Sequence, residues 1–181
     1  AEIDRENRII TDLLTLVKMD KKNADLQIQH MSINQLLEDI LKRLRPIADK
    51  RSIDLILDSF RPVEADVDEL KFTSAISNLV ENAIKYNVDD GWVRVSLDAD
   101  HKYFYVTVAD SGMGIPEDSL SRIFERFYRV DKSHSREIGG TGLGLAITRS
   151  TIGMHHGVIK VFSKEGEGTT FSVRVPLSYI P

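Results

Sequence analysis

The chain has 181 residues, of which 41% are hydrophobic, and it carries a formal net charge of −4 at pH 7. A chain of this length can bury a sizeable core, and its acidic balance argues against a nucleic-acid partner. It contains no cysteine, which excludes disulfides and thiolate metal sites, and no run of about 18 apolar residues that could span a membrane, so we expect a cytoplasmic domain.

The first 22 residues predict a helix that packs against other helices. Ile3, Ile10 and Val17 recur every seven residues, which is the spacing found where helices pack along one another. Leu14 and Leu16 broaden this apolar stripe. We therefore treat residues 1–22 as an element separate from the domain that follows.

Residues 27–177 predict one α+β domain. Apolar spacing predicts helices at 33–50, 68–86 and up to about residue 155, and strands at 54–58, 91–97, 102–109, 157–163 and 169–175. These elements are expected to form a two-layer α/β sandwich, in which a mixed, mostly antiparallel sheet is covered by helices on one face.

Two amides and a lysine share one face of the predicted helix 68–86. Asn78, Asn82 and Lys85 are spaced by four and three residues, so their side chains lie along one side of the helix. Two neutral oxygen ligands beside an ammonium group suit a hydrated magnesium ion and a polyphosphate. The alternative is a helix with an ordinary polar face toward solvent.

A carboxylate and two glycines follow the predicted strand 102–109. Asp110 stands at the strand end, and Gly112 and Gly114 allow a planar group to approach the backbone closely. The carboxylate would accept a hydrogen bond from the exocyclic amine of adenine. The alternative is an ordinary Asp-Ser-Gly turn.

A second glycine-rich segment, residues 139–147, leads directly into a predicted helix. Its backbone amides, together with the positive end of the helix, suit bound phosphates. No Gly-Lys-Ser or Gly-Lys-Thr follows, and Leu145 and Ile147 occupy positions where a dinucleotide fingerprint needs glycine. A nucleotide fold other than the P-loop or dinucleotide type is therefore expected.

Together these segments resemble the catalytic, ATP-binding domain of bacterial sensor histidine kinases, a branch of the superfamily that includes DNA gyrase, heat-shock chaperones and mismatch-repair ATPases. Residues 78–87 resemble its N box, 110–116 its first glycine box, 123–131 its F box and 139–147 its second glycine box. The resemblance covers residues 27–177. It implies a mobile lid over bound ATP between the two glycine boxes.

The resemblance also implies function and partners. ATP and Mg²⁺ would be the cofactors, and the γ-phosphoryl group would pass to a histidine on a dimerisation domain. A response regulator receiver domain would be a further partner. Residues 1–22 would be the end of the second dimerisation helix, in a longer protein that is homodimeric and anchored in the cell membrane by segments upstream of Ala1, whereas this fragment could be monomeric.

The site residues follow from the resemblance position by position. Asn78 and Asn82 would bind magnesium, Lys85 would contact phosphate, and Asp110 would bind the adenine amine. The other nucleotide contacts would come from Tyr86, Gly112, Gly114, Ile115, Tyr128, Gly140, Thr141, Gly142, Leu143, Gly144 and Thr170.

The lid segment contains arginines that suit the γ-phosphate. Arg122, Arg126 and Arg129 fall at i, i+4 and i+7 of a predicted helix, and Arg126 and Arg129 are expected to offset charge in the transition state. The alternative is an amphipathic surface helix whose arginines pair with Glu125 and Asp131.

One position separates phosphoryl transfer to histidine from ATP hydrolysis. In hydrolysing members of the superfamily a glutamate that activates water stands four residues before the magnesium-binding asparagine, and Asn78 occupies that position here. Glu81 projects about 100° away from Asn82 around the helix. A gyrase-like hydrolase and a non-catalytic nucleotide-binding scaffold remain the alternatives. None of the five histidines lies in the family's acceptor context, so the acceptor is expected outside this chain.

Overall fold

The computed structural model describes residues 2–19, 25–128 and 143–181. Four predicted site residues, Arg129, Gly140, Thr141 and Gly142, lie outside these ranges. Within them, no helix combines the length and apolarity that crossing a lipid bilayer requires.

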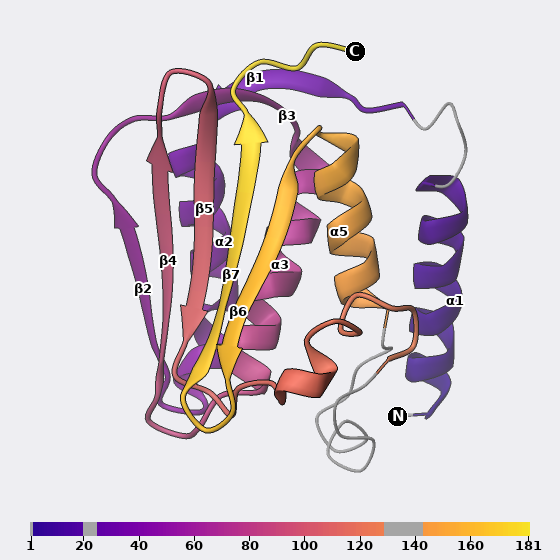
Figure 1. The fold of residues 1–181 in the computed structure, drawn as a ribbon, viewed down its shortest axis with the longest axis vertical. Helices are drawn as coiled ribbons and strands as arrows, with labels where there is room; N and C mark the ends of the chain where they lie inside the picture. The colour runs from indigo at the N-terminus through magenta and orange to yellow at the C-terminus, as the bar shows by residue number, and fades with distance from the viewer. Residues whose placement is uncertain (1, 20–24, 129–142) are drawn as a thin grey trace.

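The core of the fold is a five-stranded sheet with the strand order β2-β4-β5-β7-β6 (Figure 1). Its strands are β2 (Asp54–Ser59), β4 (Trp92–Ala99), β5 (Tyr103–Asp110), β6 (Val158–Lys164) and β7 (Gly168–Pro176). The β2–β4 pair is parallel and the other three pairs are antiparallel, which confirms the predicted mixed, mostly antiparallel sheet.

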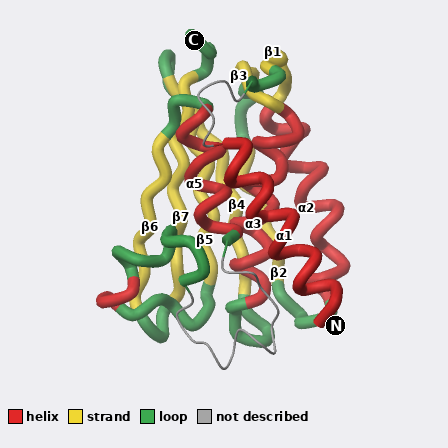
Figure 2. Tube along the Cα trace, turned by 90° about the vertical axis from the view of Figure 1, so that its right-hand side faces the viewer, coloured by secondary structure: helices red, strands yellow, loops and turns green. Residues whose placement is uncertain are grey.

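The helices cover one face of this sheet, so the domain has two layers (Figure 2). The layer consists of α2 (Ile33–Asp49), α3 (Glu69–Lys85) and α5 (Gly144–Met154). The amphipathic spacing explains α2, because Leu37, Ile40 and Leu44 are all buried in the core. Phe72 of α3 meets Phe104 of β5 edge to face, with ring centroids 5.7 Å apart, and this contact joins the two layers.

Side-chain caps fix the start of both long helices. Ser32 accepts a hydrogen bond from the amide of Gln35 at the start of α2, and Asp68 does the same for Lys71 at the start of α3. Asp68 is also bonded through its own amide, which donates to Nε2 of buried His155 at 3.0 Å. The α3 start is therefore tied directly to the end of α5.

A small antiparallel sheet of β1 (Ile28–Ser32) and β3 (Glu64–Asp68) was not expected from the sequence. Only Ala65 and Val67 of β3 turn into the core, between acidic residues, so the alternating apolar signal is too short to stand out. His30 and Asp66 pair across this sheet at 2.8 Å.

The first helix, α1 (Glu2–Met19), packs against α5 (Figure 1). Leu16 is buried and contacts Leu143 and Ala146, whereas Ile10 and Leu14 are 56% and 55% exposed. The apolar residues of α1 thus divide into one side that contacts the domain and a second side that is open to solvent.

The helix predicted through the lid arginines is absent from residues 120–128, and this expectation was wrong. A short 3₁₀ helix, η1 (Glu117–Ser119), is followed by turns closed by bonds such as Arg122 N to Ser119 O at 2.9 Å and Glu125 N to Arg122 O at 2.9 Å. Phe127 has a φ of 64°, in the left-handed region that a continuing α-helix cannot use.

Candidate functional site

The three polar residues of the α3 face, Asn78, Asn82 and Lys85, are all half-buried. Asn82 is half-buried, and its side chain forms no hydrogen bond with the residues that the structure describes. Lys85 is also half-buried, and burial lowers the pKa of its ammonium while the carboxylate of Glu81 opposes that shift. A partly desolvated cation attracts an anion more strongly than one in bulk water, so Lys85 suits a phosphate contact.

Asn78 is held more tightly than its neighbours on this face. Its Nδ2 donates to the hydroxyl of Thr148 on α5 at 3.0 Å, and the same hydroxyl donates to the carbonyl of Gly144 at 2.9 Å. A Cβ placed on Gly144 would come within 2.6 Å of Oδ1 of Asn78. Asn78 therefore joins α3 to the first turn of α5, and only glycine fits at position 144 without a shift.

Asp110 is a half-buried carboxylate at the end of β5. Burial raises the pKa of Asp110 to about 6, against the opposing effect of hydrogen bonds from the amides of Gly112 and Thr169. Both bonds, at 2.8 Å and 3.2 Å, end on Oδ1. Oδ2 receives none from the described part of the chain, so the carboxyl is oriented with one free acceptor, as an adenine amine requires.

The first glycine box packs directly on the end of α3. A Cβ on Gly112 would lie 2.5 Å from the carbonyl of Tyr86, and Met113 donates its amide to that same carbonyl at 3.1 Å. Gly114 has a φ of 72° and its backbone faces the carbonyl of Lys164. At both glycines the close neighbour is the protein's own backbone, and this packing brings Asp110 beside the helix that carries Asn82 and Lys85.

Strand register shows which threonine of β7 lies at this site. Asp110 pairs with Thr169, and Ala109 pairs with Thr170. Because side chains alternate between the faces of a sheet, Thr169 shares the helix-covered face with Asp110, whereas Thr170 lies on the uncovered face. The resemblance implies Thr170 as a nucleotide contact. Thr169, however, lies on the same face of β7 as the inward residues Phe171, Val173 and Val175.

A hydroxyl cluster supports the segment after Asp110. Ser163 Oγ accepts the amide of Ile115 at 2.8 Å and lies 2.8 Å from the hydroxyl of Thr169. Ser163 is a second residue that sequence analysis did not select. No motif identifies it, since its partners come from two other segments, the loop at Ile115 and the start of β7.

The described part of the lid segment is held by its own side chains. Tyr128 donates its hydroxyl to Ser119 at 2.8 Å, and Arg122 lies over the ring of Tyr128 at 4.6 Å while pairing with Glu125 at 3.1 Å. Arg126 is exposed. The pairing expected from the surface-helix alternative is therefore present for Arg122 and Glu125, although the helix is not.

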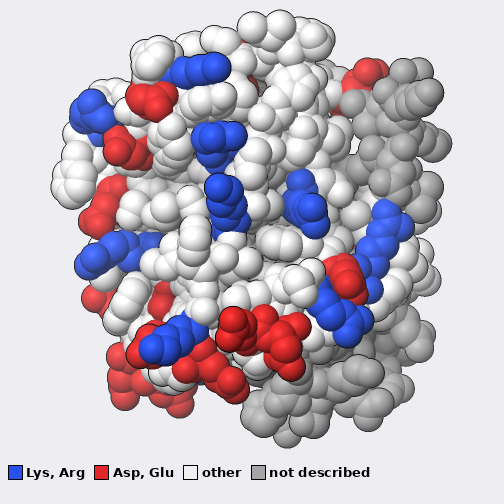
Figure 3. All heavy atoms as spheres, viewed as in Figure 1, with Lys and Arg blue, Asp and Glu red and all other residues white. Residues whose placement is uncertain are grey.

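The described residues suit a nucleotide with a divalent cation. Asn82 offers a neutral oxygen, Lys85 a cation, and Asp110 an oriented acceptor next to the glycine box. On the open face of the sheet, Figure 3 shows Lys and Arg mixed with Asp and Glu, and acidic side chains gather toward the end where β5 stops. No continuous basic stripe crosses the described surface on this face.

The chain matches one family model, described as histidine kinase-, DNA gyrase B-, and HSP90-like ATPase, over residues 67–179. It is 35% identical over 97% of its length to the sensor histidine kinase WalK of Bacillus subtilis (strain 168) and spans 29% of that protein. It is 36% identical over 98% of its length to the sensor histidine kinase RppB of Synechocystis sp. and spans 39% of it.

Solved structures share the fold. The catalytic domain of histidine kinase ThkA, in a nucleotide-free form, matches with a TM-score of 0.75 and 25% identity over 84% of this chain and 97% of that one. Full-length ShkA in complex with AMPPNP matches with a TM-score of 0.82 and 24% identity over 96% of this chain and 36% of that one. ThkA in complex with the response regulator protein TrrA matches with a TM-score of 0.78 and 23% identity, over 97% and 48% respectively.

Proposed function

This chain belongs to the family of histidine kinase-, DNA gyrase B- and HSP90-like ATPases, among the sensor histidine kinases, and we propose that it binds Mg-ATP and transfers the γ-phosphoryl group to a histidine on a dimerisation domain. The observation that carries this proposal is the carboxyl of Asp110. One oxygen is fixed by two backbone amides and the other accepts no hydrogen bond from the described residues, at the end of a strand beside the amide-bearing helix.

The roles of the chain's residues follow from their chemistry. Asp110 would accept the adenine amine, with Thr169 fixing its carboxyl, and Lys85 would bind phosphate oxygens. Asn82 would hold the magnesium ion, whose positive charge offsets negative charge on the phosphates. We propose that Asn78 assists by holding α3 against α5 and by completing the cation's surroundings through Oδ1.

The transfer step itself needs no strong base from this chain. A neutral imidazole nitrogen attacks the γ-phosphorus, the bond from that phosphorus to the bridging oxygen breaks, ADP leaves with the bond's electron pair, and the imidazole proton passes to solvent. Lys85, Arg126 and Arg129 would stabilise the charge on the phosphoryl oxygens. The amide of Asn78, which donates to Thr148, cannot take a proton from water, which disfavours hydrolysis.

We further propose the arrangement of the whole protein. Residues 1–22 would be the end of the second dimerisation helix, and 27–177 the catalytic domain; the exposed side of α1 with Ile10 and Leu14 supports a helical partner. A homodimer, a response regulator receiver domain as partner and anchoring in the cell membrane are proposed by analogy with the sensor kinases, of which ThkA has been solved with a response regulator protein.

Titration calorimetry with ATP, GTP and adenosine tests the proposal. Binding of ATP in magnesium buffer and discrimination against GTP are expected, because guanine has a carbonyl oxygen at the ring position where adenine has the amine that would donate a hydrogen bond to Asp110. Mixing the chain with a histidine-bearing dimerisation domain should then give acid-labile phosphate on that domain. Absence of ATP binding by the folded chain would refute the proposal, and binding without transfer would favour a nucleotide-binding scaffold.

A further inference from the structure

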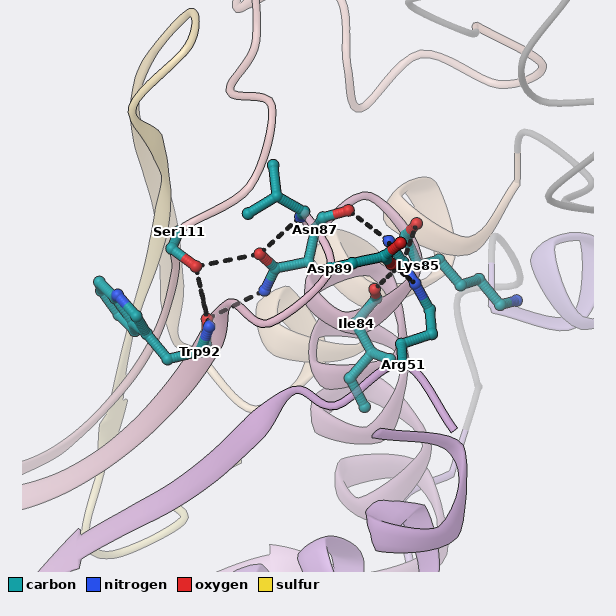
Figure 4. A network of polar contacts seen from close by, with 8 residues as sticks. Arg51, Ile84, Lys85, Asn87, Asp89, Trp92 and Ser111 are labelled. Carbon is teal, nitrogen blue, oxygen red and sulfur yellow. Dashed lines mark hydrogen bonds and ion pairs between the residues drawn. The ribbon is translucent and has the colours of Figure 1, made fainter. Parts of the chain in front are cut away.

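The side chain of Arg51 closes the end of the helix that carries Asn82 and Lys85. It follows α2 and reaches the last turn of α3, where Nη1 donates to the carbonyls of Ile84 at 2.6 Å and Lys85 at 2.8 Å. Nη2 donates to the carbonyl of Asn87 at 2.6 Å (Figure 4).

Every N–H of this guanidinium is used. Nε and the second N–H of Nη2 bond to Oδ1 of Asp89, at 3.2 Å and 3.1 Å, in addition to the three carbonyl contacts. The carbonyls at the end of a helix lack amide partners within the helix and carry partial negative charge. A planar, five-donor cation meets several of them at fixed angles, which the single ammonium group of a lysine cannot do.

The same turn is held from its opposite side by the first glycine box. Asn87 Nδ2 donates to the carbonyl of Trp92 at 2.9 Å, and the hydroxyl of Ser111 donates to Asn87 Oδ1 at 3.0 Å. Ser111 directly follows Asp110. Arg51, the end of α3, Asn87 and Ser111 therefore form one continuous network of hydrogen bonds, which ends one residue after Asp110 in the sequence (Figure 4).

Lys85 is the residue whose position this network of hydrogen bonds affects. Its carbonyl is bonded to Arg51, while Figure 4 shows its side chain pointing away from the network. The helix ends at Lys85, so without the guanidinium its carbonyl would lose this bond and the last turn could fray. Fraying would move the ammonium relative to Asp110 and so separate the phosphate contact from the base contact.

We propose that Arg51 is a positioning residue for nucleotide binding, which sets the location of the Lys85 ammonium relative to Asp110 by holding the last turn of α3. This inference rests on the proposed function. Arg51 itself would not contact the nucleotide. Its substitution would weaken the binding of the phosphates, because those are the groups that Lys85 would contact.

The test compares Arg51→Lys with wild type for ATP and for adenosine binding by calorimetry. At metal sites, loss of a hydrogen-bond partner behind a binding residue typically costs about 10- to 100-fold in affinity, and we take the lower end of that range for Lys85. We expect about tenfold weaker ATP binding with adenosine binding changed less than about twofold. The matched control is Arg61→Lys, at an exposed arginine that pairs with Asp98 at the far end of β4, and its ATP affinity should equal that of wild type.

A double mutant shows whether Arg51 acts through Lys85. In Lys85→Met the ammonium is gone, so adding Arg51→Lys should weaken ATP binding little further, whereas independent effects would multiply. Equal losses for ATP and adenosine, multiplicative losses, or wild-type ATP binding by Arg51→Lys would each overturn the inference. Should Arg51→Lys not fold, Arg51→Gln takes its place, and failure of both to fold would show a role in stability alone.

These outcomes separate the inference from the proposed function. If the wild-type chain does not bind ATP, the function itself fails. If wild type binds ATP and discriminates against GTP while Arg51→Lys behaves identically, only the positioning role of Arg51 fails.

Discussion

Oδ1 of Asp110 on β5 accepts a hydrogen bond of 3.2 Å from the amide of Thr169 on β7, 59 residues further along the chain. The pairing of two strands thus fixes the direction in which a buried carboxyl offers its second oxygen. Recognition of the base depends on tertiary structure as well as on the local Asp-Ser-Gly sequence.

The charge of Asp110 should cost stability. Its pKa is raised to about 6 by burial, above the ordinary value of 3.8 for an aspartate, so between these values the folded chain binds more protons than the unfolded chain. The contribution of Asp110 to the free energy of unfolding therefore falls as the pH rises between these two values, and it stays lower at higher pH. Asp110→Asn removes the charge, and urea unfolding at pH 8 should show a gain on the order of 2 kcal/mol that disappears below about pH 4.

The same substitution should weaken ATP binding, because an amide is a poorer acceptor than a carboxylate for the adenine amine and its N–H₂ group can meet that amine unfavourably. A variant that is more stable than wild type yet binds ATP less tightly would support a site role for Asp110. Unchanged stability at pH 8 would contradict the burial of its charge.

His155 should make the domain acid-sensitive. Burial lowers the pKa of His155, whose Nε2 accepts the amide of Asp68, so the folded chain keeps the ring neutral while the unfolded chain protonates it below about pH 6.5. Stability is therefore retained above that pH and lost as pH falls below it. In urea unfolding at pH 8, the free energy of unfolding of His155→Gln should be about 1–3 kcal/mol below that of wild type. Between pH 6.5 and pH 5, this free energy should decrease less in the variant than in wild type. Parallel pH profiles for the two proteins would argue against this effect.

Position 144 should not tolerate the added methyl group of alanine. A Cβ there would lie 2.6 Å from Oδ1 of Asn78, so Gly144→Ala should cost about 1–3 kcal/mol and weaken binding of Mg-ATP, as measured by thermal unfolding and calorimetry. Gly153→Ala is the control in the same helix. Nothing lies within 4 Å of a Cβ at Gly153, so that change should stabilise the domain by about 0.5–1 kcal/mol. Destabilisation of similar size at both positions would mean that contact with Asn78 is not the cause.

Leu16 should control the docking of α1 on α5. It is 1% exposed and contacts Leu143 and Ala146, so Leu16→Asp buries a charge and should release α1, increasing hydrogen exchange across residues 7–16. Leu14→Asp, at a position 55% exposed, should leave exchange near the wild-type value. Equal exchange in the two variants would show that the contact through Leu16 is not what holds α1.

The sequence predicted those parts of the fold whose periodicity is long. Five main strands and three long helices were expected close to their observed positions because each carries several inward apolar residues. It could not predict β3, which turns only Ala65 and Val67 into the core, or the turns around Arg122, because Phe127 adopts a left-handed backbone that its residue type does not suggest. The contacts of Arg51 and Ser163 depend on segments far apart in the chain, so local sequence gives no signal for them.

The edge strand β6 carries a further consequence for the molecule. Its exposed positions include Lys160 and Lys164 on either side of Phe162, on the side of the sheet that no helix covers. An edge that alternates ammonium groups with apolar side chains repels a second edge of its own kind. β6 therefore works against pairing of this sheet with the sheet of a second copy of the chain, even at high local concentration.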